Sequence, residues 1–323
     1  MPHREHTFES LADFAARGTR LREARPVITV GSFDGVHLGH QYLLNELVEW
    51  ARREHAPSLV LTFRTHPREM MTGREVPALN SAPHKCRLLR RYGVDAILLI
   101  EFDETLRSLP APRFMADFVR DGLNARAMLA GFNNRIGKDG EGTPALLAEI
   151  GRPLGIVVRE AERIEVSGQA MSSSAIRAHV ARGDFLWARK MLGRPYSISG
   201  VVQHGDARGR TIGFPTANVS LEGYLEPALG VYAVRVEVAG KSYDGVANFG
   251  RRPTFDKKDV LLEVHIFDFA GDIYGQQIIV SFVAYLRAEM KFAGLDALKA
   301  QIAADGESAK HILKATPGTP PPL

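Results

Sequence analysis

The sequence contains a single cysteine, Cys86, among 323 residues, so no disulfide can form within the chain. A reducing compartment is therefore expected, with Cys86 as a small buried apolar residue. No apolar run approaches the ~20 residues that a membrane-spanning helix needs. Residues 1–18 lack the apolar core of a secretory signal peptide. These absences predict a cytoplasmic protein that has no membrane partner.

A strong excess of charge of either sign is also missing. The 41 Lys and Arg residues and the 37 Asp and Glu residues leave a formal net charge of +4. So small an excess suits anionic small molecules and does not by itself indicate a nucleic-acid partner. The composition is 45% hydrophobic and 24% charged, as in globular proteins, and the length predicts two domains. Composition leaves the oligomeric state open between a monomer and a weak oligomer.

The hydrophobic pattern changes near residue 190. Before that point, short apolar runs alternate with helical periods, which is typical of a parallel sheet covered by helices on both faces. The expected strands are 26–30, 58–63, 95–102, 125–131 and 154–160. The expected helices are 43–55, 85–93, 111–123 and 173–192. Residues 1–190 are therefore predicted to form a doubly wound α/β domain.

After Gly193 the apolar residues alternate with a period of two, in short strands that end at Gly or Asp. The expected strands are 196–205, 230–240, 241–250, 260–269 and 276–287. Strands of this length and spacing predict a small antiparallel β-barrel. A helical period over 295–313 adds a terminal helix. Residues 191–323 are thus expected to form the second domain.

The segment GSFDGVHLGH, residues 31–40, lies between a predicted strand and a predicted helix. Helix N-termini attract anions, and glycines let the backbone approach a phosphate closely. His37 and His40 share one face of the first helical turn, where two imidazoles can donate hydrogen bonds to charge developing at phosphorus. The segment therefore predicts a nucleotide site, whose candidate residues are Gly31, Phe33, Asp34, Gly35, His37 and His40.

Two other interpretations of this segment remain open. A zinc site needs three or four ligands, and no Cys or Glu partner lies at usable spacing from the histidines. A helix-capping turn with two surface histidines is the second alternative.

A further candidate phosphate site is MSSSAIR, residues 171–177. Ser172 and Ser173 come just before a predicted helix, and Arg177 follows one turn later. Hydroxyl groups, free backbone N–H groups and a guanidinium together can bind a triphosphate. Taken alone, the segment favours a plain N-cap with a surface arginine.

The stretch HGDARGRTIGFPTAN, residues 204–218, has glycines at every fourth position. Gly205, Gly209 and Gly213 predict a loop able to wrap phosphates. It is not a Walker A loop, because no Gly-Lys-Ser/Thr follows. A hairpin loop rich in turn formers is an equally good interpretation of the spacing alone.

Oxygen ligands and a carboxylate accompany this loop. Thr216 and Asn218 lie on one side of an extended segment, which suits Mg²⁺ because that ion takes few protein ligands. Glu263 and His265 share one face of a predicted strand, where Glu263 could act as general base for a hydroxyl. The alternative for Glu263 is a solvent-facing strand residue.

Together these segments resemble the bifunctional riboflavin kinase/FAD synthetase family of bacteria, over about residues 25–313. The resemblance is strongest in GSFDGVHLGHQYLL, SSSAIR, GRPYSISGVVQHGDARGRTIGFPTAN, NFGRRPTF and LRAEMKF. GSFDGVHLGH and SSSAIR are similar to the phosphate-binding segments of HxGH nucleotidyltransferases. The resemblance implies two ATP-dependent reactions. The barrel would phosphorylate riboflavin to FMN, and the N-terminal domain would join FMN to the AMP part of ATP, releasing pyrophosphate and giving FAD.

The resemblance also implies roles for individual residues. Thr216 and Asn218 would serve Mg-ATP, and Glu263 would activate the terminal hydroxyl of the flavin. His37 and His40 would stabilise the transition state at the α-phosphorus, with no zinc involved. The triphosphate and the rest of the nucleotide would contact Ser172, Ser173, Arg177 and Asn133, and Arg287 would contact the flavin. The partners expected are small molecules, with no nucleic acid.

The sequence departs from the family pattern in two places. Thr65 stands before His66 where the family commonly reads PHP. Asn134 and Ile136 replace two aromatics of a Gly-x-Asp/Asn-Phe-x-Phe-Gly pattern. Three functions therefore stay open: a working bifunctional enzyme, a riboflavin kinase with a weakened adenylyltransferase half, and a non-catalytic flavin-sensing regulator that contacts nucleic acid. The retained residues that act only in a transition state argue against the regulator.

Overall fold

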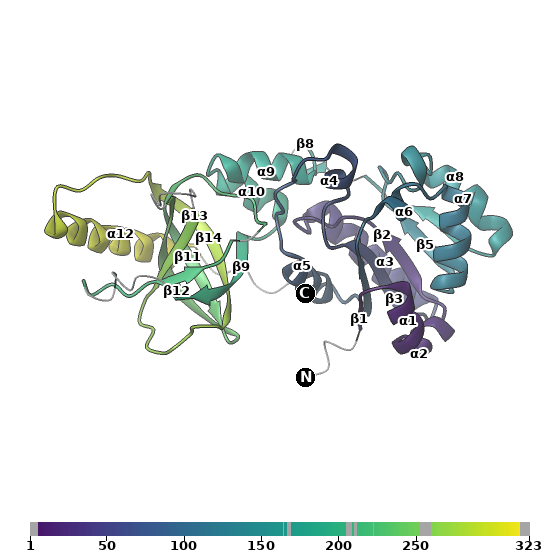
Figure 1. The fold of residues 1–323 in the computed structure, drawn as a ribbon, viewed down its shortest axis with the longest axis horizontal. Coiled ribbons are helices and arrows are strands. Elements are labelled where there is room, and N and C mark those ends of the chain that lie inside the picture. Colours follow the sequence, from purple (N-terminus) through teal and green to yellow (C-terminus); the bar gives the residue numbers. More distant parts are fainter. Residues whose placement is uncertain are drawn as a thin grey trace. The chain divides into compact units, whose positions relative to one another are not determined.

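A computed structural model describes residues 6–163, 165–166, 169–204, 209, 212–221, 223–251 and 260–316. These residues form two compact units (Figure 1). The first unit holds the described residues up to Val76 and from Ala82 to Met171. The second unit holds Pro77–Ser81 and the described residues from Ser172 onward. No helix in the described part of the chain is long and apolar enough to cross a membrane.

Six parallel strands form the sheet of the first unit, in the order β1-β4-β3-β2-β5-β6. Their bounds are Thr7–Phe8 (β1), Val27–Val30 (β2), Ser58–Phe63 (β3), Ala96–Ile100 (β4), Ala127–Ala130 (β5) and Val157–Glu160 (β6). Every residue of β2, β3, β4 and β5 is buried, as expected where helices cover both faces of a sheet. The sequence predicts all of these strands except β1, whose two residues are too few to show a period.

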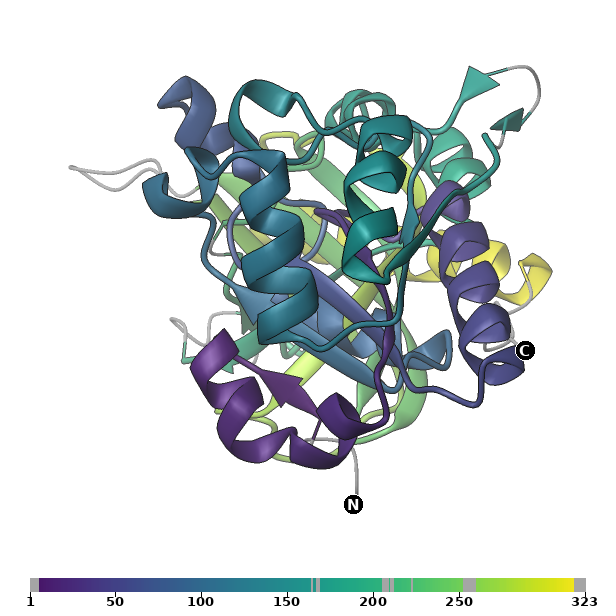
Figure 2. The same cartoon turned by 90° about the vertical axis from the view of Figure 1, so that its right-hand side faces the viewer.

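Helices cover both faces of this sheet (Figures 1 and 2). The α-helices are Leu11–Arg17 (α1), Thr19–Glu23 (α2), Leu38–Arg53 (α3), Pro67–Thr72 (α4), Ala82–Arg91 (α5), Glu104–Arg107 (α6), Ala111–Arg113 (α7) and Pro144–Gly151 (α8). Neighbouring strand residues point to opposite faces. Val27 and Val60 accordingly pack with α3 and α5, whereas Ile28 and Leu61 pack with α8 and the helix after α7. This arrangement confirms the doubly wound domain.

The predicted helix over residues 111–123 differs in form from the observed one. After α7 the chain continues as a π-helix, η1 (Phe114–Gly122). At its end, the N–H of Leu123 donates to the carbonyl of Phe118, five residues back, at 2.8 Å. Apolar spacing is compatible with either turn width over so short a segment, so the sequence pattern does not distinguish the two helix types. Shorter elements complete the unit: 3₁₀ turns at Lys138–Gly140 (η2) and Arg152–Leu154 (η3), and paired strands at Glu165–Val166 (β7) and Gln169–Ala170 (β8).

The second unit is built on a closed antiparallel barrel with the strand order β10-β13-β12-β11-β14-β9. The strands are Tyr196–Gln203 (β9), Ala217–Val219 (β10), Gly230–Val238 (β11), Lys241–Arg251 (β12), Val260–Ile266 (β13) and Gln277–Arg287 (β14). The sequence predicts five of them and expects β10 only as an extended segment. β10 pairs with both β9 and β13 and so closes the barrel, which confirms the predicted architecture.

Two helices pack on the barrel: α10 (Phe185–Leu192) and the terminal α12 (Leu295–Ala315). A third, α9 (Ser173–Ala181), packs on α10. Phe185 of α10 stacks on Phe282 of β14, with ring centroids 5.3 Å apart. Leu313 of α12 packs in a core cluster with Val231 of β11. By contact, α9 and α10 therefore belong to the second unit. The boundary between the two activities, expected at 190/191, stays a prediction.

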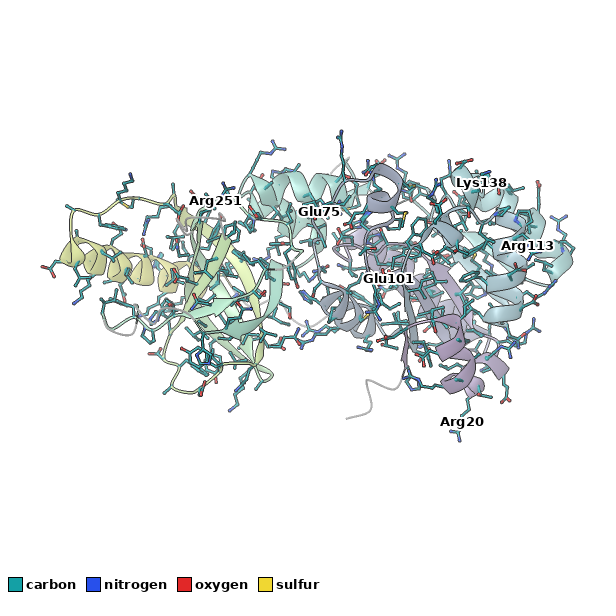
Figure 3. All side chains as sticks on the ribbon, in the orientation of Figure 1. Arg20, Glu75, Glu101, Arg113, Lys138 and Arg251 are labelled. Atoms are coloured by element: carbon teal, nitrogen blue, oxygen red, sulfur yellow. The ribbon has the colours of Figure 1, made fainter. Side chains whose placement is uncertain are left out.

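Apolar side chains form the cores of both units, and most charged side chains are exposed. Cys86 is buried in the core that includes α3 and α5, which confirms the expectation for it. Charged side chains such as Arg20 and Arg113 are exposed and extend away from the ribbon (Figure 3). Lys85 is an exception, because its side chain is buried.

A buried hydroxyl group holds the segment Pro77–Ser81 on the barrel. Tyr224 lies between β10 and β11, and its hydroxyl accepts a hydrogen bond from the N–H of Ser199 at 3.0 Å. The same hydroxyl lies 2.9 Å from Oγ of Ser81 and 3.1 Å from the carbonyl oxygen of Ser199. Burial raises the pKa of Tyr224, so the phenol keeps its proton at neutral pH. The hydroxyl therefore satisfies buried backbone groups that no water reaches.

We expect Tyr224→Phe to lower the free energy of unfolding by about 1–3 kcal/mol, because it leaves the buried N–H of Ser199 without its partner. Tyr243→Phe is the matched control. Tyr243 is half-buried on β12 and packs its ring against Phe269, so its replacement should cost about 0.5 kcal/mol or less. Urea denaturation of both variants measures the difference. Equal losses would contradict the role given to the Tyr224 hydroxyl.

Candidate active sites

The carboxyl ends of β2, β3 and β5 lie at one edge of the first unit's sheet, because the strands are parallel. The loop after β2 carries GSFDGVHLGH, and the loop after β5 carries Asn133. Ligands of open parallel sheets bind at this edge. The structure therefore brings the two predicted nucleotide segments of the first unit to the same edge.

The loop after β2 is a tight, strained turn. Phe33, Gly35 and Val36 have φ values of 49°, 79° and 40°, although only glycine adopts positive φ freely. Strain of this kind costs on the order of 1–3 kcal/mol per residue and is concentrated at ligand-binding and catalytic sites. Asp34 and its neighbours are buried within the turn. A Cβ atom at Gly31 would lie 3.1 Å from the ring of Phe33, a tight contact that leaves little room for a side chain there.

The two histidines lie side by side at the start of α3. His37 is the N-cap of the helix, and its Nδ1 accepts the backbone N–H of His40 at 3.3 Å. The two rings stack with centroids 3.7 Å apart at an angle of 15°. Because Nδ1 of His37 is an acceptor, the proton of the neutral ring lies on Nε2, which is then a donor. The predicted shared face is confirmed, together with the helix cap that the sequence left open.

The loop after β5 is fastened by the residues that depart from the family pattern. Nδ2 of Asn134 donates to the carbonyl of Val30, the last residue of β2, at 2.9 Å. Ile136 is buried in the core on one face of the sheet. Asn133 itself is exposed at the same edge. The loop is thus held against the start of the histidine segment by contacts of this chain's own side chains.

Lys85 of α5 is a residue at this edge that the sequence interpretation missed. Its Nζ donates to the carbonyls of Ser32 and Phe63, at 3.0 and 2.5 Å. Burial lowers the pKa of this lysine to about 8, while the nearby charge of Asp34 raises it. The sequence did contain a signal for its burial, because Lys85 lies three residues before Leu88 and so shares the core-facing side of the helix.

The predicted triphosphate residues of the SSSAIR segment lie in the second unit. The hydroxyl of Ser172 accepts the N–H of Ala175 at 3.2 Å and so caps α9. Nε of Arg177 donates to the carbonyl of Pro77 at 2.9 Å. The plain N-cap that the sequence favoured for this segment is therefore present. Binding of the triphosphate by Ser172, Ser173 and Arg177 stays a prediction.

A cavity of about 690 Å³ opens in the second unit. Four predicted site residues line it, together with His265: Gly209, Thr216, Glu263 and Arg287. Its volume lies in the range of small-molecule sites. Apolar side chains make up much of the remaining lining, among them Val231, Val246, Phe292, Leu295, Leu298 and Ile302. Glu263 and His265 share this cavity, which confirms that they lie on one face of β13.

Arg287 lines the cavity while its guanidinium binds a carboxylate. Its Nη2 and Nε lie 2.7 and 3.0 Å from the carboxylate oxygens of Asp305 on α12. Asp305 is 6% exposed and also accepts a hydrogen bond from Gln301. The pair attaches the cavity-lining part of α12 to the end of β14. Asp305 could not be found from the sequence, because the ion pair joins residues on different elements.

Strand pairing places two asparagines beside Glu263. Asn218 of β10 and Asn248 of β12 are both paired in register with Glu263 of β13. Directly opposite residues of antiparallel strands share a face of the sheet. Asn248 lines the cavity with Glu263 and was not singled out from the sequence. The three side chains form a polar row across the barrel wall.

Asn218 has an unused oxygen in this row. The residue is 6% exposed, and its Oδ1 has no hydrogen-bond partner among the described residues. A buried amide oxygen without a partner is costly unless a ligand satisfies it. Oxygen atoms of amides, hydroxyls and phosphates are the ligands that Mg²⁺ prefers. Asn218, with Thr216 two residues before it, therefore fits a magnesium site completed by phosphate oxygens.

A second cavity, of about 510 Å³, shares Thr216 with the first. Its lining includes Pro215, Ile266, Phe269 and Tyr274. Among the described residues of the chain, no group of three or more His, Cys, Asp or Glu side chains is arranged to hold a metal. Thr216, the residue expected to serve Mg-ATP, lines both cavities. Glu263 and His265 line the first and Val264 and Ile266 the second, so the two linings use opposite faces of β13.

The predicted glycine loop is described only in part. Gly205 lies outside the described residues. A Cβ atom at Gly209 would lie 2.3 Å from the carbonyl oxygen of Phe214, so a side chain there would clash with the backbone. Gly213 has a φ of 89°, which other residues adopt only with strain. Both glycines are required by the loop's shape, whatever they contact in a ligand.

Comparisons with known proteins match both halves of the chain. A family model described as FAD synthetase matches residues 20–175, and one described as riboflavin kinase matches residues 192–313. A bifunctional riboflavin kinase/FMN adenylyltransferase of Haemophilus influenzae is 40% identical over 285 residues, which cover 88% of this chain and 92% of that protein. A protein of the same description from Escherichia coli K12 is 40% identical over 292 residues, covering 90% and 93%.

A solved structure is similar over nearly the same extent. A Streptococcus pneumoniae chain described as a macrolide-efflux protein is 35% identical, with a TM-score of 0.78, and the match covers 88% of this chain and 94% of that chain. The matches to bifunctional enzymes favour the two-reaction enzyme over the non-catalytic regulator that the sequence left open. The chain belongs to the family of bifunctional riboflavin kinase/FMN adenylyltransferases.

Proposed function

We propose how this bifunctional enzyme divides its two reactions. The barrel phosphorylates riboflavin to FMN, and the parallel-sheet unit adenylylates FMN to FAD. The position of Glu263 carries the proposal for the barrel, because its carboxylate lines the cavity and lies opposite Asn218, whose buried oxygen has no hydrogen-bond partner among the described residues. The stacked histidines at the N-terminus of α3 carry the proposal for the other unit.

In the barrel, the 690 Å³ cavity takes the flat apolar ring system of riboflavin, and its sugar-alcohol chain reaches Glu263. The Glu263 carboxylate accepts the proton of the terminal hydroxyl as that oxygen bonds to the γ-phosphorus of ATP. The bond between the γ-phosphorus and the bridging oxygen breaks, and ADP leaves. The 510 Å³ cavity takes ATP, whose phosphates reach Thr216, a residue that lines both cavities. Arg287, fixed by Asp305, contacts the flavin.

Mg²⁺ completes the kinase site in this proposal. Thr216 and Asn218 would hold the ion together with phosphate oxygens of ATP. The loop with Gly205, Gly209 and Gly213 would surround the phosphates. When bound, Mg²⁺ neutralises negative charge on the β- and γ-phosphates. The unused, buried Oδ1 of Asn218 supports this assignment.

In the parallel-sheet unit, a phosphate oxygen of FMN bonds to the α-phosphorus of ATP, and pyrophosphate leaves. Nε2–H of His37 donates to an α-phosphate oxygen, where negative charge grows in the transition state. His40 stacks on His37 and helps to stabilise the negative charge on the α-phosphate. The strained turn after β2, with Gly31, Phe33, Asp34 and Gly35, approaches the phosphates. Asn133 contacts the rest of the nucleotide. The role proposed for Ser172, Ser173 and Arg177 at the β- and γ-phosphates rests on the SSSAIR sequence and not on the geometry of this unit.

We further propose that the enzyme works in the cytoplasm as a monomer or weak oligomer, with small molecules as its partners and no bound zinc.

The contacts of Asn134 and Ile136 support a working adenylyltransferase over a weakened one, because they hold the loop that the missing aromatics would otherwise shape.

Separate sites predict that each reaction can be lost alone. Glu263→Gln should lower FMN formation by ~10²–10⁴-fold, the contribution of a general base. It should leave FAD formation from supplied FMN unchanged. The variant His37→Ala/His40→Ala should lose FAD formation by at least ~10²-fold and still make FMN. Chromatographic separation of the flavins measures both reactions.

Each variant's intact reaction is the control for its folding. Kinase activity of Glu263→Gln within about tenfold of wild type would fall short of a general base and contradict the assignment. Near-normal FAD formation by the double histidine variant would contradict the role of the histidines. One zinc per chain, found by elemental analysis, would assign the histidines to a metal instead.

Asn218→Ala should raise the Mg²⁺ concentration at which kinase activity is half-maximal, because a ligand oxygen is lost. The Mg²⁺ dependence of FAD formation should stay unchanged. Asn248→Ala is the matched control for loss of an asparagine beside Glu263, since Asn248 flanks Glu263 from the strand on its other side. Equal Mg²⁺ titrations for wild type and Asn218→Ala would place Asn218 in a purely structural role.

A further inference from the structure

Lys85 is a buried cation that neither reaction, as assigned above, uses. Its side chain is 6% exposed, although lysine is almost never fully buried without partners. Burial of an ammonium costs several kcal/mol in proteins. The other buried residues of α5 are His84, Cys86, Leu88 and Leu89, so Lys85 is the one lysine or arginine on the buried side of this helix.

The contacts of Lys85 join two loops at the carboxyl edge of the sheet. Its Nζ donates to the carbonyl of Phe63, the last residue of β3, and to the carbonyl of Ser32, one residue before the strained turn. The hydroxyl of Thr62 donates to the same Ser32 carbonyl at 3.1 Å. The carbonyl of Ser32 is therefore held from two sides, by α5 and by β3.

The charge of Lys85 has a counterpart inside the turn. Asp34 is 5% exposed, and its charge stabilises the protonated amine. The thiolate form of Cys86, beside Lys85 on α5, acts in the same direction. Burial opposes both, and the resulting pKa of Lys85 is about 8. Hydrogen bonds from a charged donor are about twice as strong as neutral ones, so protonation strengthens the tie to both carbonyls.

We propose that Lys85 is a positioning residue for adenylyl transfer: its ammonium fixes Ser32 to the end of β3 and so places the turn at Phe33–Val36, and His37 after it, against the α-phosphate. The proposal rests on the assignment of FAD synthesis to the histidine segment. Lys85 acts through the backbone of the turn and makes no contact with the reacting atoms. Misplacement of a reacting group by about 1 Å can cost ~10²-fold in rate, so a modest movement of the turn suffices.

The test replaces Lys85 by residues that keep its length. Lys85→Met removes the donors and the charge, and should lower kcat of FAD synthesis by ~10–10²-fold while KM for ATP changes less. Lys85→Arg keeps a charged donor and should recover part of the loss. FMN formation by the same preparations should stay normal in both variants. Lys138→Met is the control for loss of a lysine in the same unit, since Lys138 is exposed on η2 (Figure 3).

The pH dependence supplies a readout that a merely structural lysine would not give. Lys85 loses its charge as the pH rises through about 8, so wild-type FAD synthesis should fall on that side while FMN formation does not. Burial raises the pKa of Cys86, the other titrating group beside Lys85, which places its ionisation above its usual range. Arg64, which follows Phe63 and acts on Cys86, keeps its charge throughout. In Lys85→Arg the alkaline fall near pH 8 should disappear.

Two results would overturn the proposal. Normal kcat for FAD synthesis in Lys85→Met would show that the tie is not needed. If that variant does not fold, the wild-type profile decides, and the absence of an alkaline fall near pH 8 overturns the proposal. Retained FAD synthesis in His37→Ala/His40→Ala is a different outcome. It would refute the assignment of the site itself and is read from a separate variant.

Discussion

Parallel pairing of β2 with β3 and β5 is the constraint on which the adenylyltransferase site depends, because it ends all three strands at one edge. Hydrogen bonds from side chains to backbone carbonyls then hold the loops at that edge together. Nδ2 of Asn134 bonds the loop after β5 to Val30, and Nζ of Lys85 bonds the loop after β2 to the end of β3. The strained turn between these two ties presents the stacked pair His37 and His40 at the N-terminus of α3. Backbone strain and a buried charge are thus concentrated where the chemistry is proposed.

Closure of the barrel has the corresponding role in the kinase unit. β10 is only three residues long, yet its pairing with β9 and β13 completes the wall and sets Asn218 directly opposite Glu263. An unused buried oxygen beside a carboxylate is unfavourable in an empty site and becomes favourable when a cation binds. The apolar side of the same cavity is completed by α12, which the Arg287–Asp305 pair attaches to β14. In this unit, the residues that stabilise the fold therefore include residues of the proposed flavin site.

Local patterns predict most of the fold and the sites that lie within one segment. Alternation and helical periods find the strands of both units, and the glycine-histidine segment identifies the end of β2. Contacts between distant segments have no such signature: Asn134 bonds Val30 across 104 residues, and Lys85 bonds Ser32 across 53. β10 and β1 are too short to show a period. Some glycines were predicted to contact phosphate, whereas Gly209 is already required by the carbonyl of Phe214 in its own loop.

Because the proposal gives the chain two independent sites, two variants that each lack one reaction should together convert riboflavin to FAD. Glu263→Gln and His37→Ala/His40→Ala should each fail to convert riboflavin to FAD with Mg-ATP, for opposite reasons. When the two are mixed, the double histidine variant should supply FMN and the Glu263→Gln variant should consume it, so FAD should form at a rate that rises with the concentration of either protein. A mixture that makes FMN but no FAD, or neither flavin, would contradict the division of the two reactions between the two units.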